Sequence, residues 1–148
     1  MDAIQFLKQQ HEQAKQMFGR IEQAGAGERG RLWRQLAPEL AAHEQLEEQH
    51  LYGPIAREAG GRDATLVDWE GHHHREVREA EAMIRQIDAA DAGGEGWLDQ
   101  VRQLESALER HIQEEEGRIW PRIRQVWDER RLEQAGQQME AARGRRAA

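Results

Sequence analysis

The chain has 148 residues, of which 38% are apolar and 33% charged, and its formal net charge is −7. This length fits one domain that buries a core of its own. The sequence contains no cysteine, which excludes disulfides, thiolate metal sites and iron–sulfur clusters. The acidic balance argues against nucleic acid as a partner. No membrane span or signal peptide is recognisable, so we expect a cytoplasmic protein.

The first half of the chain predicts two amphipathic helices. The first covers residues 2–21, where Asp2 and Gln5 form the sequence pattern of a capping box. Glycines then mark a loop before the second helix, which covers residues 31–58. Pro54 should bend this helix or end it early. The glycines that close it are Gly60 and Gly61.

The second half predicts two more helices. The third begins at a cap supplied by Asp63 or Thr65 and ends at residues 87–90. The fourth starts near Trp97, and Pro121 interrupts its apolar stripe, so we expect a kink there.

Residues 129–148 are polar and rich in arginine, which predicts a frayed helix followed by a solvated tail. The preceding residues, 1–128, form the predicted domain. Four amphipathic helices with short turns predict an all-α fold, an antiparallel up-down-up-down four-helix bundle with a short C-terminal helical extension or tail.

Two helices carry the same pair of metal-ligand residues within their apolar stripes. His43 and Glu47 are four residues apart, so they face the same side of their helix. His111 and Glu115 repeat this spacing on the fourth helix. Buried imidazoles and carboxylates are costly without partners, and both are metal ligands. The spacing therefore predicts a metal site inside the bundle.

The other two helices supply further ligand types at similar depths. The first helix places His11 in its stripe, and the third carries Glu70 and His74, also four residues apart. Four histidines with two or three carboxylates exceed what one tetrahedral zinc uses. Bridging carboxylates in a bundle core are typical of two-metal sites. The residues thus favour a di-iron centre, with manganese or zinc as alternatives.

This order of motifs resembles the hemerythrin family, in particular the bacterial HHE cation-binding domains. The similarity covers residues 4–125, where HEQLEEQHLYGPI and HIQEEEGRIWPRI resemble the paired metal motifs and HREVREA the third-helix segment. The resemblance implies that Glu47 and Glu115 bridge two ions. The ligand set that it implies is His11, His43, Glu47, His74, His111 and Glu115.

Three assignments stay open at this point. His73 is the alternative to His74, Glu116 is the alternative to Glu115, and Glu70 is either a metal ligand or a residue in a salt bridge or at the surface. Oxygen-carrying hemerythrins have a His-x-x-x-His pair on the third helix, and pairing His74 with the second member puts Glu70 at the first. A carboxylate there would favour ferric iron, which argues against reversible O₂ carriage.

Three functions fit these residues. The first is a module that binds O₂, NO, peroxide or iron for sensing, storage or stress response. The second is a di-iron enzyme that consumes peroxide or repairs nitrosative damage. The third is a metal-free structural or partner-binding bundle. The expected partners are a small diatomic ligand or peroxide and a separate redox or output protein, with the chain a monomer or a homodimer.

Overall fold

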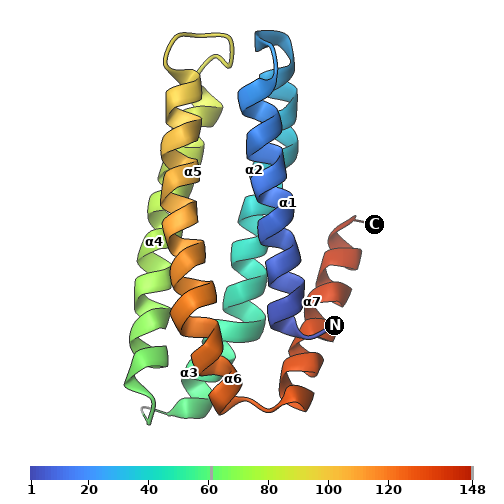
Figure 1. Ribbon diagram of the computed structural model, residues 1–148, viewed down its shortest axis with the longest axis vertical. Helices are drawn as coiled ribbons and strands as arrows, with labels where there is room; N and C mark the ends of the chain where they lie inside the picture. Colours follow the sequence, from blue (N-terminus) through green and yellow to red (C-terminus); the bar gives the residue numbers. More distant parts are fainter. Residues whose placement is uncertain (61, 148) are drawn as a thin grey trace.

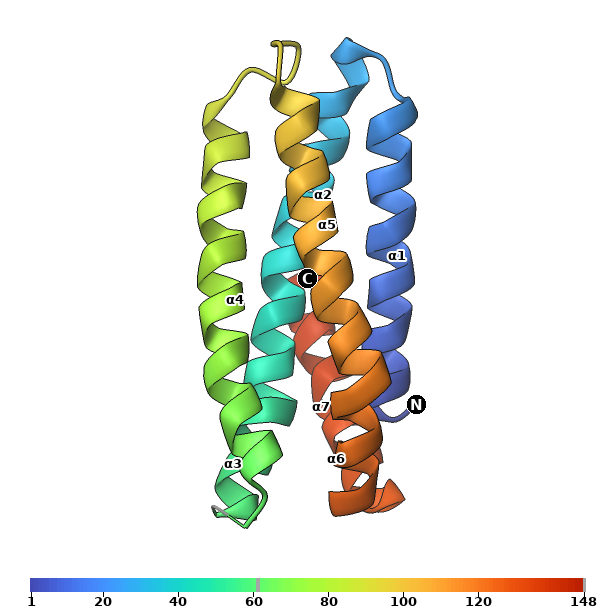
Figure 2. The ribbon, with the colours of Figure 1, turned by 60° about the vertical axis from the view of Figure 1, so that its left-hand side comes forward.

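Four long helices run side by side along the molecule in the computed structural model, which describes residues 1–60 and 62–147. They are α1 (Ala3–Gln23), α2 (Ala26–Glu47), α4 (Ala64–Ala89) and α5 (Trp97–Glu114). Each runs opposite to the one before it (Figures 1 and 2). The predicted all-α, up-down-up-down bundle is therefore confirmed. No helix of the described residues has the length and apolar character needed to cross a membrane.

The helix ends follow the local signals in the sequence. Asp2 and Gln5 form the predicted capping box of α1. The Asp63 side chain accepts a hydrogen bond from the Leu66 amide and so caps α4, as predicted for one of the two candidates. Gly60 ends the preceding helix with a φ of 56°, a left-handed conformation that glycine adopts without strain. Gly61 lies outside the described residues.

Both prolines that follow the His–Glu pairs come just after a widened helical turn. The π-helical turn η1 (Glu48–Tyr52) joins α2 to α3 (Gly53–Ala59), and η2 (Glu115–Ile119) joins α5 to α6 (Trp120–Val126). A proline lacks the amide hydrogen and its ring clashes with the carbonyl four residues back, which disfavours a regular turn there. The predicted bends thus take the form of π turns, which are frequent at functional sites.

The C-terminal segment differs from the frayed helix and solvated tail that its composition predicts. Residues Glu129–Ala147 form one helix, α7, which lies beside α1 (Figures 1 and 2). Leu132, Ala135 and Met139 are buried against the bundle. The predicted helical extension is therefore present as a packed fifth helix. Residue 148 lies outside the described residues.

The apolar core consists of two clusters with a polar layer between them. The cluster at the end with the N-terminus includes Leu7, Leu46, Trp69 and Trp120, and the cluster near the opposite end includes Phe18, Leu36, Ala80 and Leu104. Along α1, along α4 and along α5 with η2, the buried polar residues fall between the members of the two clusters, and on α2 His43 and Glu47 flank Leu46, the first residue there of the other cluster. The polar layer consists of His11, His43, Glu47, His73, His111 and Glu115.

Candidate metal centre

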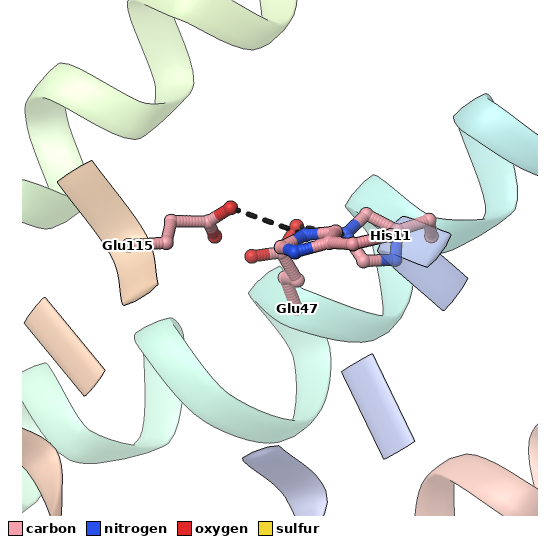
Figure 3. A group of neighbouring side chains, drawn as sticks. His11, Glu47 and Glu115 are labelled. Carbon is pink, nitrogen blue, oxygen red and sulfur yellow. Dashed lines mark hydrogen bonds and ion pairs between the residues drawn. The ribbon is translucent and has the colours of Figure 1, made fainter. Parts of the chain in front are cut away.

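The polar layer brings histidines and glutamates from all four long helices to one point. Their donor atoms form two groups of four, and within each group they all lie within 4.8 Å of one another. Glu47 and Glu115 belong to both groups and are completely buried. Figure 3 shows these two carboxylates pointing toward His11, Glu47 from α2 and Glu115 from the turn that continues α5. The two groups are His11, His43, Glu47 and Glu115, and Glu47, His73, His111 and Glu115.

The first group is built on α1 and α2. The Nε2 atoms of His11 and His43 are 3.2 Å apart. His43 Nε2 lies 2.7 Å from Glu47 Oε1, and His11 Nε2 lies 3.4 Å from Glu115 Oε1. Two donors bound to one ion at about 2.1 Å stand about 3 Å apart. The spacing of these atoms therefore suits a shared cation.

The second group is built on α4 and α5. His73 Nδ1 lies 3.3 Å from His111 Nε2, and His111 Nε2 lies 3.5 Å from Glu115 Oε1. His73 is completely buried and His111 is 5% exposed, so neither ring is free to turn toward water. Two imidazole nitrogens again converge on the shared carboxylates.

The outward nitrogens of three rings are held by a second layer of polar groups. The Nδ1 atoms of His11 and His43 lie 2.9 Å from Glu116 Oε2 and 2.7 Å from Gln10 Oε1, respectively. The Nδ1 atom of His111 is hydrogen-bonded to Glu76. A partner on the outer nitrogen fixes the ring orientation and leaves the lone pair of the inner nitrogen for a metal.

A phenol completes the centre on the side of Glu115. The Tyr52 hydroxyl donates a hydrogen bond to Glu115 Oε2 and accepts one of 2.8 Å from Trp120 Nε1. Burial and the charges of Glu115 and Glu47 raise the pKa of Tyr52 well above its ordinary value. The phenol therefore stays protonated in the metal-free protein and orients the carboxylate.

The unpaired atoms of this layer test whether its residues fit a metal. Both carboxylate oxygens of Glu47, Oε1 of Glu115 and Nε2 of His73 are buried without a hydrogen-bond partner among the described residues. His43 lies close to Glu47, but in a geometry that does not form a hydrogen bond. Such buried groups are costly unless something neutralises them. A cation between the rings and the carboxylates would neutralise them, so the residues of this layer fit a metal ion.

The pKa values of the metal-free layer also reflect the cost of burying these groups without a cation. Burial and the nearby charge of Glu115 raise the pKa of Glu47 well above its ordinary value. Burial alone would lower the pKa of His111, but the Glu115 carboxylate beside it raises this pKa to about 11. Burial lowers the pKa of His43 to about 3 and that of His73 to about 4. Two rings are thus neutral, as ligands must be. Burial alone would raise the pKa of Glu115, but contacts with Glu47, His111 and His11 hold this pKa well below its ordinary value, so this carboxylate is ionised, and His111 carries a proton that a cation would displace.

The structure brings together five of the residues predicted as ligands: His11, His43, Glu47, His111 and Glu115. The placement of Glu70 and His74 in this layer was wrong. They lie with Glu48 in a separate, partly exposed group, in which His74 Nε2 is 2.8 Å from Glu48 Oε2. His73, the alternative, occupies the α4 position in the polar layer. Glu116 holds the outer nitrogen of His11 and does not replace Glu115.

The pattern on α4 contained a signal for His73. The buried residues of this helix include Leu66, His73, Ala80 and Ile87, at intervals of seven residues. Residues seven apart return to nearly the same side of a helix. Glu70 and His74 share one side of the helix, but Glu70 is only partly buried and His74 is exposed. Trp69, one turn before His73, lies on the buried side and stacks on His111 with ring centroids 5.3 Å apart.

Comparison with known proteins agrees with this geometry. The family model described as the hemerythrin HHE cation binding domain matches residues 2–123. The chain belongs to this family. Its structure is similar to the crystal structure of a hemerythrin HHE cation binding domain-containing protein, the Rv2633c homolog from Mycobacterium kansasii, with a TM-score of 0.79 and 26% identity. The similarity covers 96% of this chain and 85% of the other. A search of curated proteins finds no match.

Membership in the family makes this HHE domain a cation-binding protein. The position of His73 changes one inference from the sequence. With His73 as the second member of the third-helix pair, the first place falls to Trp69, which offers no metal ligand. The argument for an oxygen-rich iron at Glu70 therefore no longer applies. The α4 helix instead contributes a single histidine to the layer.

Proposed function

We propose that this HHE domain holds two iron ions side by side, bridged by Glu47 and Glu115. The observation that carries the proposal is that both carboxylates belong to two overlapping donor groups. His11 and His43 would complete the set around one ion, and His73 and His111 the set around the other. Imidazole and carboxylate donors without thiolates suit iron.

Each ion would receive two imidazoles and two bridging oxygens from the chain. Octahedral ions take six donors, so positions would stay open on both irons. When bound, the iron pair would supply redox chemistry and open positions for a small ligand such as O₂, NO or peroxide. The open sites favour reaction with such a ligand over storage of iron alone. We include a cytoplasmic location in this proposal.

The surrounding side chains have separate roles in this proposal. Tyr52 holds Glu115 through its hydroxyl, and Glu116, Gln10 and Glu76 hold the histidine rings. The two apolar clusters on either side of the layer limit the access of water. A dry surrounding strengthens the electrostatic hold of the carboxylates on a cation and tunes its redox potential.

A metal count on the full chain tests this proposal. The protein is loaded with ferrous iron under anaerobic conditions, desalted and analysed for iron per chain, and the expected ratio is two. His43→Ala should lose most of this iron. His50→Ala is the matched control, because His50 lies on η1 outside both donor groups and should leave the ratio at two. A ratio near zero, or tight binding of a single zinc only, would overturn the di-iron proposal and favour the metal-free bundle.

A second measurement separates a binding module from an enzyme. The iron-loaded protein is mixed with excess hydrogen peroxide, and the peroxide consumed per chain is followed over time. Many turnovers per chain assign an enzyme, whereas consumption that stops near one equivalent per iron pair assigns a binding or sensing module.

A further inference from the structure

A cavity of about 300 Å³ lies directly beside the candidate metal centre, between α1, α2 and α5. Its lining includes His11, His43, His111 and Glu115, so any molecule inside it would face the polar layer. A water molecule occupies about 30 Å³ in the liquid. The cavity is therefore about ten times larger than a diatomic ligand or hydrogen peroxide requires.

The walls of this cavity away from the metal centre are largely apolar. The apolar residues of these walls belong to the second apolar cluster or pack against it, and the amides of Gln10, Gln13 and Gln35 lie among them. These apolar residues include Ala14, Met17, Phe18, Leu36, Leu40 and Leu108. An apolar cavity of about 150 Å³ already accommodates benzene. The lining thus has both the volume and the chemistry to hold an organic body with one ring or a short alkyl chain.

The charged residues of the lining argue for a ligand without charge. The lining contains the carboxylates of Glu39, Glu44, Glu105 and Glu109 against the cations of Lys15 and Arg143. Burial raises the pKa of Glu44 and that of Glu105 to about 7, so these two carry only part of their charge at neutral pH. An anionic ligand would lose its hydration among the apolar walls and would lie near the carboxylates of Glu39 and Glu109. An organic cation would in turn lose its hydration among the apolar walls.

We propose that this cavity binds a neutral, apolar organic molecule and holds its short polar end, an alcohol or a hydroperoxide, against His11 and His43. This rests on the proposed function only for the presence of a metal pair at that end, because the walls that hold the organic body need no metal. The substrate class is therefore a neutral organic hydroperoxide or alcohol, larger than a bare diatomic molecule.

The test uses the full-length, metal-free protein and two probes that share one aromatic ring. Benzyl alcohol is neutral and benzoate is anionic, and both are titrated by calorimetry and by shifts of side-chain NMR signals. Benzyl alcohol should bind with a dissociation constant on the order of 1 mM or lower, at least about tenfold tighter than benzoate. Signals of Met17 and Leu40 should shift, since both side chains line the cavity.

Two variants that fill the cavity and one control variant decide whether benzyl alcohol binds in the cavity. Ala14→Phe and Met17→Trp each add a ring to the wall and should weaken benzyl alcohol binding at least about tenfold. Val67→Phe adds a ring on α4 at a 39% exposed position outside the lining and should leave binding unchanged. Circular dichroism identifies a variant that fails to fold, and the other filled variant then decides.

Equal binding of the two probes would overturn the proposal, as would unchanged binding by a folded filled variant or the lack of measurable binding to the wild type. These results do not depend on metal loading. A failed iron count therefore leaves the cavity proposal standing, and a failed titration leaves the iron pair standing.

Discussion

Three consecutive histidines on α4 have very different surroundings. The side chains of His72, His73 and His74 are 37%, 0% and 44% exposed, respectively. Each step along a helix turns the side chain by about 100°, so a single residue in a row can point into the bundle. The buried one, His73, reaches the polar layer, while His74 meets Glu48 at the surface.

This difference predicts opposite outcomes for two neighbouring alanine substitutions. His73→Ala removes one of the two imidazoles of the second donor group, so we expect the iron count to fall from two per chain to about one or less. His74→Ala removes only a partly exposed ion pair and should leave the count at two. Iron and protein are quantified in the same desalted sample. Loss of iron in His74→Ala with normal loading of His73→Ala would reverse the assignment.

The sequence predicted which residues meet in the polar layer where the spacing left one choice. The pairs His43–Glu47 and His111–Glu115 repeat at four residues, and each has a single histidine in its apolar stripe. On α4 three adjacent histidines left the helix rotation open, and periodicity alone did not resolve it. The partners Gln10 and Glu76 were missed because they come from other helices, and only the tertiary packing brings them to the rings.

A pair of carboxyl groups outside the metal centre gives a pH-dependent prediction. Burial and the adjacent Glu22 raise the pKa of Glu105 to about 7. An acid whose pKa is higher in the folded state favours folding below its unfolded pKa, and this contribution is lost as the pH rises through 7. Glu105→Gln removes the charge and should therefore stabilise the protein at pH 8 but not at pH 4.

The expected increase in Tm for Glu105→Gln at pH 8 is about 2 °C, since solvent partly screens the charge of this half-buried group. Glu133→Gln removes the same charge at an exposed position of α7 and serves as the control. Thermal unfolding of the metal-free variants at both pH values gives the comparison. If Glu105→Gln stabilised the protein equally at pH 4 and pH 8, the effect would not come from the raised pKa of Glu105.

At the scale of the element, α7 shows why the C-terminal segment was misjudged. Its buried apolar residues, Leu132, Ala135 and Met139, are few among many charged and polar residues, so the segment resembles a solvated tail in composition. The packing depends as much on a glycine. A Cβ atom on Gly136 would lie 2.3 Å from the Met1 carbonyl oxygen, closer than real contacts allow. Gly136 thus lets α7 approach the start of α1, which a hydrophobicity pattern does not reveal.

Two glycines of α7 should respond to alanine in opposite directions. Gly136→Ala forces the N-terminal backbone and α7 apart and should destabilise the protein by about 1–3 kcal/mol. A Cβ on Gly144 meets nothing within 4 Å among the described residues. Gly144→Ala should therefore be neutral or stabilise by up to about 1 kcal/mol, because alanine favours the helix. Denaturant unfolding of both variants measures the difference, and equal effects would show that α7 does not pack on α1 in this way.

At the scale of the whole molecule, the polar layer that could bind a metal divides the apolar core into two clusters. The two apolar clusters supply most of the burial that holds the bundle together. The layer between them holds unpaired carboxylate oxygens of Glu47 and Glu115, which oppose folding when no cation is present. The fold was predictable because the helical periodicity of the apolar residues survives these polar interruptions. The same interruptions indicated the metal centre.

Because the unpaired carboxylates of this layer oppose folding, we expect metal binding to stabilise the folded chain. A cation that binds the folded chain alone stabilises it by about 4 kcal/mol at a free concentration of about a thousand times its Kd. For a chain of this length that is a rise in Tm of about 10 °C. We therefore expect ferrous iron, added anaerobically, to raise Tm, and a chelator to restore the metal-free value. Glu47→Gln removes a buried charge that belongs to both donor groups and should show little or no increase.

The size of this increase should depend on pH. In the metal-free protein, burial raises the pKa of Glu47 and so favours its protonated form, and His111, whose pKa is about 11, carries a proton. A bound cation displaces these protons, so each released proton lowers the apparent affinity about tenfold for every unit by which the pH falls. The protonated His111 also favours the metal-free fold at low pH, and this contribution is lost only as the pH rises toward 11. The iron-induced rise in Tm should consequently grow from pH 6 to pH 8. A rise that is constant over this range, or larger at pH 6, would mean that iron binds without displacing these protons and therefore at another place.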